Sequence, residues 1–277
     1  MTDLYYRNFD STEFKPYQID CSKCYGLCCI GLCFSKMDGF PENKAAGKLC
    51  KNLLPNYSCK IHSLLNNKGL KGCISYDCLG AGQKICDKLS FVPKWYDENI
   101  DKVFIAFIKV VQLYQTIWYL KESSLLKVAY LSHEQLDLLI KEGENIAEDS
   151  IENLALYDLE PFQTKANTLI KDICWKLCDS LGTKYSNSSV SDYMGKDLRN
   201  RNLTGKDFSM SFLIAANLEG AILYGANFLG ADMRDVKIKN TDLSKCLFLT
   251  QQQINSALGN SRTQIPPHIK RPDSWDL

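Results

Sequence analysis

The sequence has little histidine, because only His62, His133 and His268 occur among its 277 residues. A catalytic zinc site keeps an open coordination position beside a general acid or base. No H-x-E motif or comparable pairing occurs near the cysteines that could form such a site. The sequence therefore carries no catalytic signal. Whether the protein is an enzyme stays open, and a binding role is favoured.

An excess of charge of one sign is also lacking, since 33 lysines and arginines face 32 aspartates and glutamates. Such a balance provides no strong signal for nucleic acid. The N-terminal residues, MTDLYYRNFDSTEFK, lack the apolar core of a signal peptide. Residues 103–120 are the one plausible membrane span, but Lys109, Gln112 and Gln115 interrupt them and the apolar residues recur at helical spacing. We therefore expect a cytoplasmic protein without a membrane span.

Cysteine, in contrast, is abundant and concentrated. Ten of the 13 cysteines lie between Cys21 and Cys86. In a reducing cytoplasm such density indicates metal more often than disulfides, and the odd total leaves at least one thiol unpaired. Two cysteines separated by two residues, such as Cys21 and Cys24, can place both sulfurs on one tetrahedral ion. Thiolates suit zinc and iron–sulfur clusters alike, so the spacing does not distinguish the two.

The arrangement Cys21-x2-Cys24-x3-Cys28-Cys29, followed by Cys50 and by Cys59-x-Ile61-His62, resembles the CxxCxxxCC family of zinc- or iron-chelating proteins. The resemblance covers about residues 21–73, and it lacks the Arg-Pro element that usually precedes the last cysteine. It implies zinc or iron as the cofactor, with an iron–sulfur cluster as an alternative. The expected ligands are Cys21, Cys24, Cys28, Cys29, Cys50, Cys59, His62, Cys73 and Cys78.

These donors exceed what one four-coordinate ion needs, so two centres, or a cluster together with a zinc, are both open. Cys33 and Cys86 lie outside the family pattern, as does Cys78, and these three either form a second site or pack in the core. The metal itself either replaces a hydrophobic core in this glycine-rich stretch or forms a functional centre.

The middle of the chain has the periodicity of helices. Apolar residues at helical spacing predict a helix over residues 98–121, Ser132 begins a second with a capping box, and a third covers about 161–181. Shorter helices are expected at 42–53 and 60–67. Cys174 and Cys178 share one face of the third helix, where they either ligate metal or fill the core.

A repeat of five residues follows without a break, with a large apolar residue at every fifth position from Tyr193 to Phe248. Small residues stand two positions before most of these, and the period indicates a solenoid. About residues 191–276 resemble the pentapeptide-repeat family, which implies a right-handed quadrilateral β-helix. Cys246 then faces the interior, and Thr250 with Gln253 begins a capping helix.

The predicted fold is therefore a multidomain α + β protein. Residues 1–92 form an irregular cysteine-rich metal-binding domain, residues 93–186 a helical bundle, and residues 187–277 a short right-handed quadrilateral β-helix with a C-terminal helical cap. The oligomeric state is not indicated.

The favoured function is a metal-binding protein whose solenoid docks another protein. The main alternative is an iron–sulfur enzyme or redox protein. A DNA mimic that protects gyrase, known among pentapeptide-repeat proteins, is less favoured because the array is short and holds more basic than acidic residues.

Overall fold

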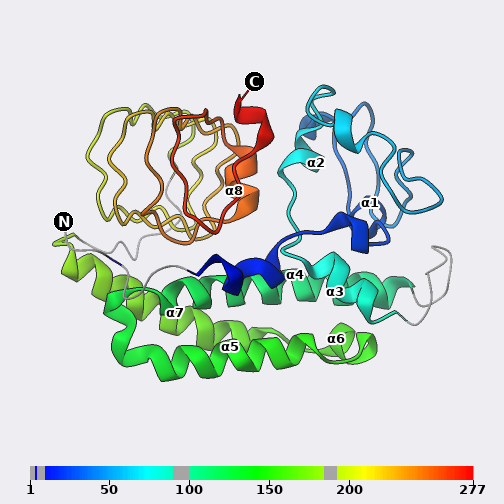
Figure 1. The fold of residues 1–277 in the computed structure, drawn as a ribbon, viewed down its shortest axis with the longest axis horizontal. Helices are drawn as coiled ribbons and strands as arrows, with labels where there is room; N and C mark the ends of the chain where they lie inside the picture. Colours follow the sequence, from blue (N-terminus) through cyan, green and yellow to red (C-terminus); the bar gives the residue numbers. More distant parts are fainter. Residues whose placement is uncertain (1–3, 5–9, 90–99, 184–191, 277) are drawn as a thin grey trace. The chain divides into compact units, whose positions relative to one another are not determined.

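A computed structural model describes residue 4 and residues 10–89, 100–183 and 192–276 (Figure 1). The α-helices in these ranges are α1 Leu27–Gly31, α2 Lys71–Ser75, α3 Ala81–Asp87, α4 Ile100–Ser124, α5 His133–Ala147, α6 Ile151–Leu156, α7 Glu160–Ser180 and α8 Gln251–Ser256. Short 3₁₀ segments are Ser11–Tyr17, Cys21–Lys23, Lys36–Asp38, His62–Leu64, Lys127–Ser132 and Asp273–Asp276.

The chain forms two compact units that are each built from separate stretches of sequence. Unit 1 consists of Met1–Ser11, Tyr119–Asp137 and Asn167–Leu277, and unit 2 of Thr12–Trp118 and Leu138–Ala166. Helices α4, α5 and α7 therefore contribute residues to both units. The division into three consecutive domains stays a prediction, and the two units are described in turn.

The solenoid of unit 1 is built from parallel β-bridges, which up to Leu247 join residues 20 apart, such as Asp197 with Asn217 and Asn217 with Lys237. Four five-residue units therefore make one coil. The last two bridges, to Leu258 and Gln264, span 21 and 22 residues. The sequence predicted a β-helix, but in the described residues these bridges are isolated and no continuous strand or sheet forms. The reason is local, because a two-residue turn, with one further residue on each side of it, separates successive bridge residues.

The corners of the coils share one backbone conformation. Every fifth residue from Gly195 to Asn240 has a positive φ, including Met210 at 54° and Ala215 at 57°. Side chains with a Cβ tolerate this left-handed region only at a cost, so the coils stabilise these corners against local preference. The large residues between the corners point inward, and Phe208 stacks on Phe228 with ring centroids 5.2 Å apart.

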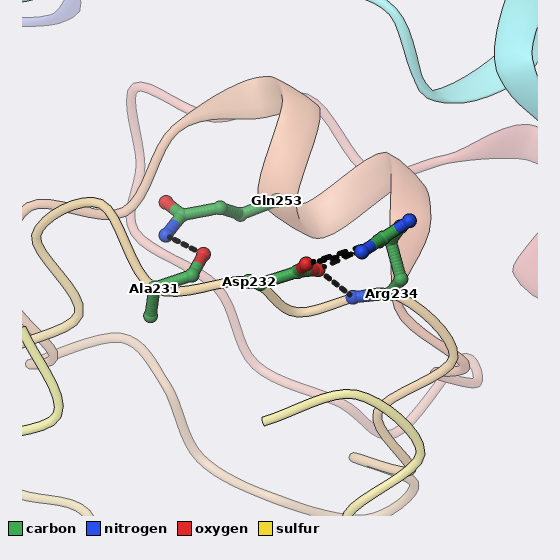
Figure 2. Close-up of polar contacts among 4 residues, drawn as sticks. All are labelled: Ala231, Asp232, Arg234 and Gln253. Atoms are coloured by element: carbon green, nitrogen blue, oxygen red, sulfur yellow. Dashed lines mark hydrogen bonds and ion pairs between the residues drawn. The ribbon is translucent and has the colours of Figure 1, made fainter. Parts of the chain in front are cut away.

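The last coil is closed by α8, whose capping box is present as predicted from Thr250 and Gln253. The Gln253 side chain also reaches the coil before it, donating to the carbonyl of Phe228 at 2.8 Å. It also donates to the carbonyl of Ala231 at 2.9 Å (Figure 2). Beside it, Arg234 forms an ion pair with Asp232 on the solenoid surface (Figure 2). The cap thus adds hydrogen bonds to two backbone carbonyls near the end of the solenoid, of which that of Phe228 also accepts from the Ala231 amide.

One side of the solenoid faces the end of α7. The bridged residues Asp207, Asn227 and Leu247 on this side are all buried. Asn227 Nδ2 lies 3.7 Å from the Sγ of Cys174 and donates to Asp207 at 3.2 Å. Burial raises the pKa of the Cys174 thiol, so Cys174 is a neutral packing residue in this structure.

A buried carboxyl group joins α4 to the last coil within unit 1. Glu122 is 0% exposed, and its Oε1 accepts a hydrogen bond of 2.7 Å from the Phe248 amide. Its Oε2 has no hydrogen bond in the described residues and lies 3.9 Å from His268 Nε2. Burial raises the pKa of Glu122 to about 8 and lowers that of His268 to about 3. Both groups are therefore neutral near pH 7, and they form no salt bridge despite their proximity.

The helices of unit 2 pack closely around Gly143 of α5. A Cβ on Gly143 would lie 2.8 Å from Phe162 of α7 and 2.9 Å from Ile117 of α4. Lys109, which interrupts the apolar run of α4, donates to the carbonyls of Ala155 and Tyr157 at 2.9 and 2.6 Å. Its charge therefore stabilises the C-terminal end of α6.

The predicted helices of the middle region are confirmed as α4, α5 and α7, apart from residues 98 and 99, which lie outside the described residues. Gly182 follows α7 with a φ of 66°. By length and composition α4 could cross a membrane, and 61% of its most apolar window is buried within the protein. The helix expected at 42–53 is wrong, because Lys44 and Leu53 form β-bridges with Phe34 and Cys59. At 60–67 only the 3₁₀ turn His62–Leu64 forms.

Phe228→Ala should destabilise the protein by about 3–5 kcal/mol, because it removes a fully buried ring and leaves a cavity. Phe212→Ala is a matched control at an outward position that is 45% exposed, and it should cost less than about 1 kcal/mol. Guanidinium unfolding followed by circular dichroism measures both. Equal losses would contradict the inward and outward assignment.

The buried Glu122 predicts that stability falls as pH rises. Its folded pKa of about 8 exceeds the unfolded value of 4.5, so its stabilising contribution is complete below pH 4.5 and is lost as pH rises through about 8. His268 acts in the opposite sense, and its effect is complete above its unfolded value of 6.5. Between pH 6.5 and about 8 only Glu122 of this pair titrates.

Relative to Glu122→Gln, which mimics the protonated acid, we expect the wild type to lose about 2 kcal/mol across this window. The comparison with this variant is needed because the lowered pKa of Cys24, about 7, raises the stability of both proteins above pH 7. Thermal unfolding at several pH values measures the difference between the two proteins. A difference that stays constant, or that moves in favour of the wild type as pH rises, would rule out this protonation state.

Candidate functional site

The candidate site is the set of ten cysteines from Cys21 to Cys86, all of which belong to unit 2 and are free thiols. Glycines with a left-handed φ directly precede α1, which carries Cys28 and Cys29, and α3, which carries Cys86. Gly26, at 72°, directly precedes α1, and Gly80, at 79°, directly precedes α3. Because glycine has no Cβ, it adopts the left-handed conformation directly before each helix without steric strain.

One group of sulfurs gathers at α3, and we name Cys24, Cys78 and Cys86 the α3 thiol group. A Cβ on Gly82 would lie 2.9 Å from Cys24 Sγ and 3.6 Å from Cys78 Sγ, so the helix leaves room for both sulfurs. Cys86 Sγ accepts a hydrogen bond of 3.2 Å from the Tyr25 amide. A hydrogen bond from the Cys86 thiol lowers the pKa of Cys24 to about 7 and raises that of Cys86.

A second group lies at α1 and comprises Cys28, Cys29, Cys50, Cys59 and Cys73, which we name the α1 thiol group. The sulfurs of Cys28 and Cys29 are 4.0 Å apart. The Cys50 amide donates to the Cys29 carbonyl at 3.1 Å, and Cys59 is held by its bridge to Leu53. The pKa of Cys73 is raised to about 12. Burial is the largest cause, and the negative charges of the Cys28, Cys50 and Cys59 thiolates add to it.

Lys44 organises the loop between these cysteines. Its Nζ donates to the carbonyls of Ile30 at 3.1 Å, Ala45 at 3.1 Å and Lys48 at 2.7 Å. The same ammonium lies 4.8 Å from the ring centroid of Phe34. A single cation thereby ties the end of α1 to the chain that leads to Cys50.

The donor chemistry fits a thiophilic ion, and the geometry supplies pairs of sulfurs. Tetrahedral zinc, with Zn–S bonds of about 2.3 Å, places its sulfurs about 3.8 Å apart. The Cys28–Cys29 separation of 4.0 Å is close to that value. In the described part of the chain, however, no three Cys, His, Asp or Glu side chains converge as a complete coordination sphere would require.

The two remaining expected ligands, Cys21 and His62, are both exposed. Cys21 is exposed and opens the 3₁₀ segment that leads to Cys24, whose amide donates to the Cys21 carbonyl at 3.3 Å. His62 is also exposed, in the 3₁₀ segment after Cys59. Cys33 is exposed as well.

Sequence reasoning left Cys86 open between a second site and core packing, and its seven-residue helix carries it to Cys24. Two other residues of this region, Asp77 and Lys44, were missed. Asp77 is buried, and burial raises its pKa to about 6 against the opposing hydrogen bond from the Leu79 amide. An isolated aspartate or a single lysine such as Lys44 has no spacing signal, so neither could be found in the sequence.

The opposite side of α3 borders a cleft of about 610 Å³. Gln83, Lys84 and Asp87 line it, whereas Gly82 and Cys86 of the same helix belong with the thiols. The Tyr17 hydroxyl donates to Glu144 at 2.8 Å in the cleft wall. The walls carry charges of both signs and do not select one ligand class.

Comparison with known proteins identifies the repeat and one full-length relative. The family model described as pentapeptide repeats matches residues 213–248 in eight copies. The chain is 35% identical over 269 residues to the uncharacterized protein YybG of Bacillus subtilis, covering 92% of this chain and 94% of that protein. No solved structure matches the chain significantly. The relation of residues 21–73 to the CxxCxxxCC family stays a prediction.

The site geometry predicts which thiols a bifunctional reagent will join. Dibromobimane, which fluoresces after it bridges two thiols, should link Cys28 to Cys29 because their sulfurs are 4.0 Å apart. Peptide mapping by mass spectrometry should find this bridge and only single modification of the exposed Cys33. The control Cys29→Ser should abolish the bridge. Single modification of both Cys28 and Cys29 in the wild type would contradict the arrangement.

Proposed function

This chain belongs to the family of Bacillus subtilis YybG and carries pentapeptide repeats, and we propose that it is a cytoplasmic metal-binding protein whose solenoid docks another protein. The observation that supports metal binding is the grouping of eight cysteines into the α1 and α3 thiol groups. In this proposal the solenoid is a short right-handed quadrilateral β-helix.

The thiol groups support a metal because few other forces hold this part of unit 2 together. Between residues 34 and 69, regular structure is limited to two three-residue 3₁₀ segments and two isolated β-bridges. Thiolate–metal bonds would cross-link such loops, as they do in small metal-stabilised domains. Zinc or iron held by the α1 thiol group would join Cys28 and Cys29 to Cys50, Cys59 and Cys73.

The α3 thiol group would hold a second ion or complete a cluster. Cys24, Cys78 and Cys86 supply three sulfurs, and Cys21 lies three residues before Cys24 as a further donor. His62 stands next to the α1 thiol group in sequence and would be recruited there. The ligands would be deprotonated on binding, so loading releases protons.

The docking role rests on the sides of the solenoid. The column that faces α7 is buried, whereas the outward residues of the other sides reach solvent. Phe212 and Ile222 are 45% and 50% exposed at positions that polar residues occupy elsewhere in the repeat. Exposed apolar side chains on a rigid, regular surface are typical of a protein-interaction site.

Metal and acid-labile sulfide should be measured on protein purified without oxygen. The proposal expects zinc or iron in the wild type, a large loss of it in Cys28→Ser, and unchanged content in the matched control Cys33→Ser. Zinc without sulfide supports a structural site, and iron with sulfide supports a cluster and the redox alternative. Wild-type protein that contains neither zinc nor iron would refute the metal-binding function.

A further inference from the structure

The first coil of the solenoid differs from the later ones at the positions that hold small residues. Its residues there are Lys196, Arg201 and Lys206. In the next coil, 20 residues on, the equivalent positions are Ala216, Ala221 and Ala226, which are buried. Three cations thus occupy one end of an array whose equivalent later positions hold small uncharged residues.

Two of these three cations, Lys196 and Lys206, lie over the ring of Tyr193. Lys196 Nζ lies 4.9 Å and Lys206 Nζ 5.8 Å from the centroid of the Tyr193 ring. Lys196 and Arg201 are exposed and Lys206 is half-buried. Cation–π contact favours this placement, which concentrates positive charge over the solenoid axis.

The nearby carboxylates are engaged in their own turns. Asp192 accepts from the amide of Met194, Asp197 from that of Arg199, and Asp207 from that of Ser209. Asp197 also forms an ion pair with Arg199. In the part of the chain that the structure describes, none of Lys196, Arg201 and Lys206 forms such a pair.

The backbone of the first coil is open on the same end. In the second coil the amides of Asn217 and Ile222 donate to the carbonyls of Lys196 and Arg201, both at 2.9 Å. The equivalent residues of the first coil, Asp197 and Asn202, have neither amide nor carbonyl bonded to another backbone group among the described residues. An unpaired edge of this kind can accept an added extended segment.

We propose that the first-coil end, formed by Tyr193, Lys196, Arg201, Lys206 and the open edges of Asp197 and Asn202, binds an extended segment rich in aspartate and glutamate from a partner protein. This deepens the docking role proposed for the solenoid and rests on it. The segment bridges to the open edge while its carboxylates meet the three cations. Asp197 and Asn202 can each form only one β-bridge with the segment, so the attraction between opposite charges supplies most of the binding energy.

A second copy of this chain is the wrong occupant for this end. Two first-coil ends facing each other would bring six unpaired cations together, which opposes association. A nucleic acid would satisfy the charges, but its backbone cannot complete the amide and carbonyl pairs of the edge. The charge and the open edge together therefore select a peptide.

The test uses fluorescence anisotropy with a labelled peptide of alternating glutamate and threonine. We expect the full chain to bind it and to reject the matched lysine–threonine peptide. The triple variant K196A/R201A/K206A should bind roughly tenfold more weakly, from three exposed ion pairs. The control K237A/K239A/R262A removes the same charge from exposed positions elsewhere in unit 1 and should leave binding unchanged.

The charge-reversed K196E/R201E/K206E variant should exchange the preference and bind the lysine–threonine peptide, which keeps the test informative if the alanine variant folds poorly. The inference is overturned by absence of wild-type binding, by equal loss in the control, or by tighter binding of an oligothymidine strand. Self-association of the alanine variant without peptide binding would also overturn the inference. It would show that the cations serve only to prevent two first-coil ends from pairing. Each of these results leaves the metal content, and hence the metal-binding function, untouched.

Discussion

The hydrogen bonds between residues one coil apart determine the structure of unit 1. Each coil donates amides to the next and receives amides from it, as when Leu198 donates to Asn217 and Asn217 to Lys196. From Asp192 to Leu247 this exchange aligns residues 20 apart in columns. Which residues are buried, which side faces α7 and which charges stand at the first coil all follow from that register.

The solenoid could be predicted from sequence because its signal is periodic. A large residue every fifth position and a capping box at Thr250 are local features, and both are present in the structure. The contact of Glu122 with Phe248 joins residues 126 positions apart and depends on burial alone. No local sequence pattern predicts such a pair. The sequence around His268 likewise does not predict that this residue is buried beside Glu122.

The cysteine stretch was predictable in composition but not in geometry. Spacing identified the thiols, yet it could not assign Cys86 to the same group as Cys24, because the turn at Gly80 and the length of α3 decide that contact. The helix expected at 42–53 failed for a related reason. Lys44 bonds three carbonyls at once and so commits this segment to a loop.

The interleaving of the two units has a consequence for synthesis on the ribosome. Residues 119–137 of unit 1 emerge early, but Glu122 meets its partners only when Phe248 and His268 have been made. Unit 2 has all of its residues by position 166, well before the solenoid exists. The cysteine-bearing unit can therefore fold first, while the α4 segment of unit 1 waits with an unburied carboxyl group for the last coil.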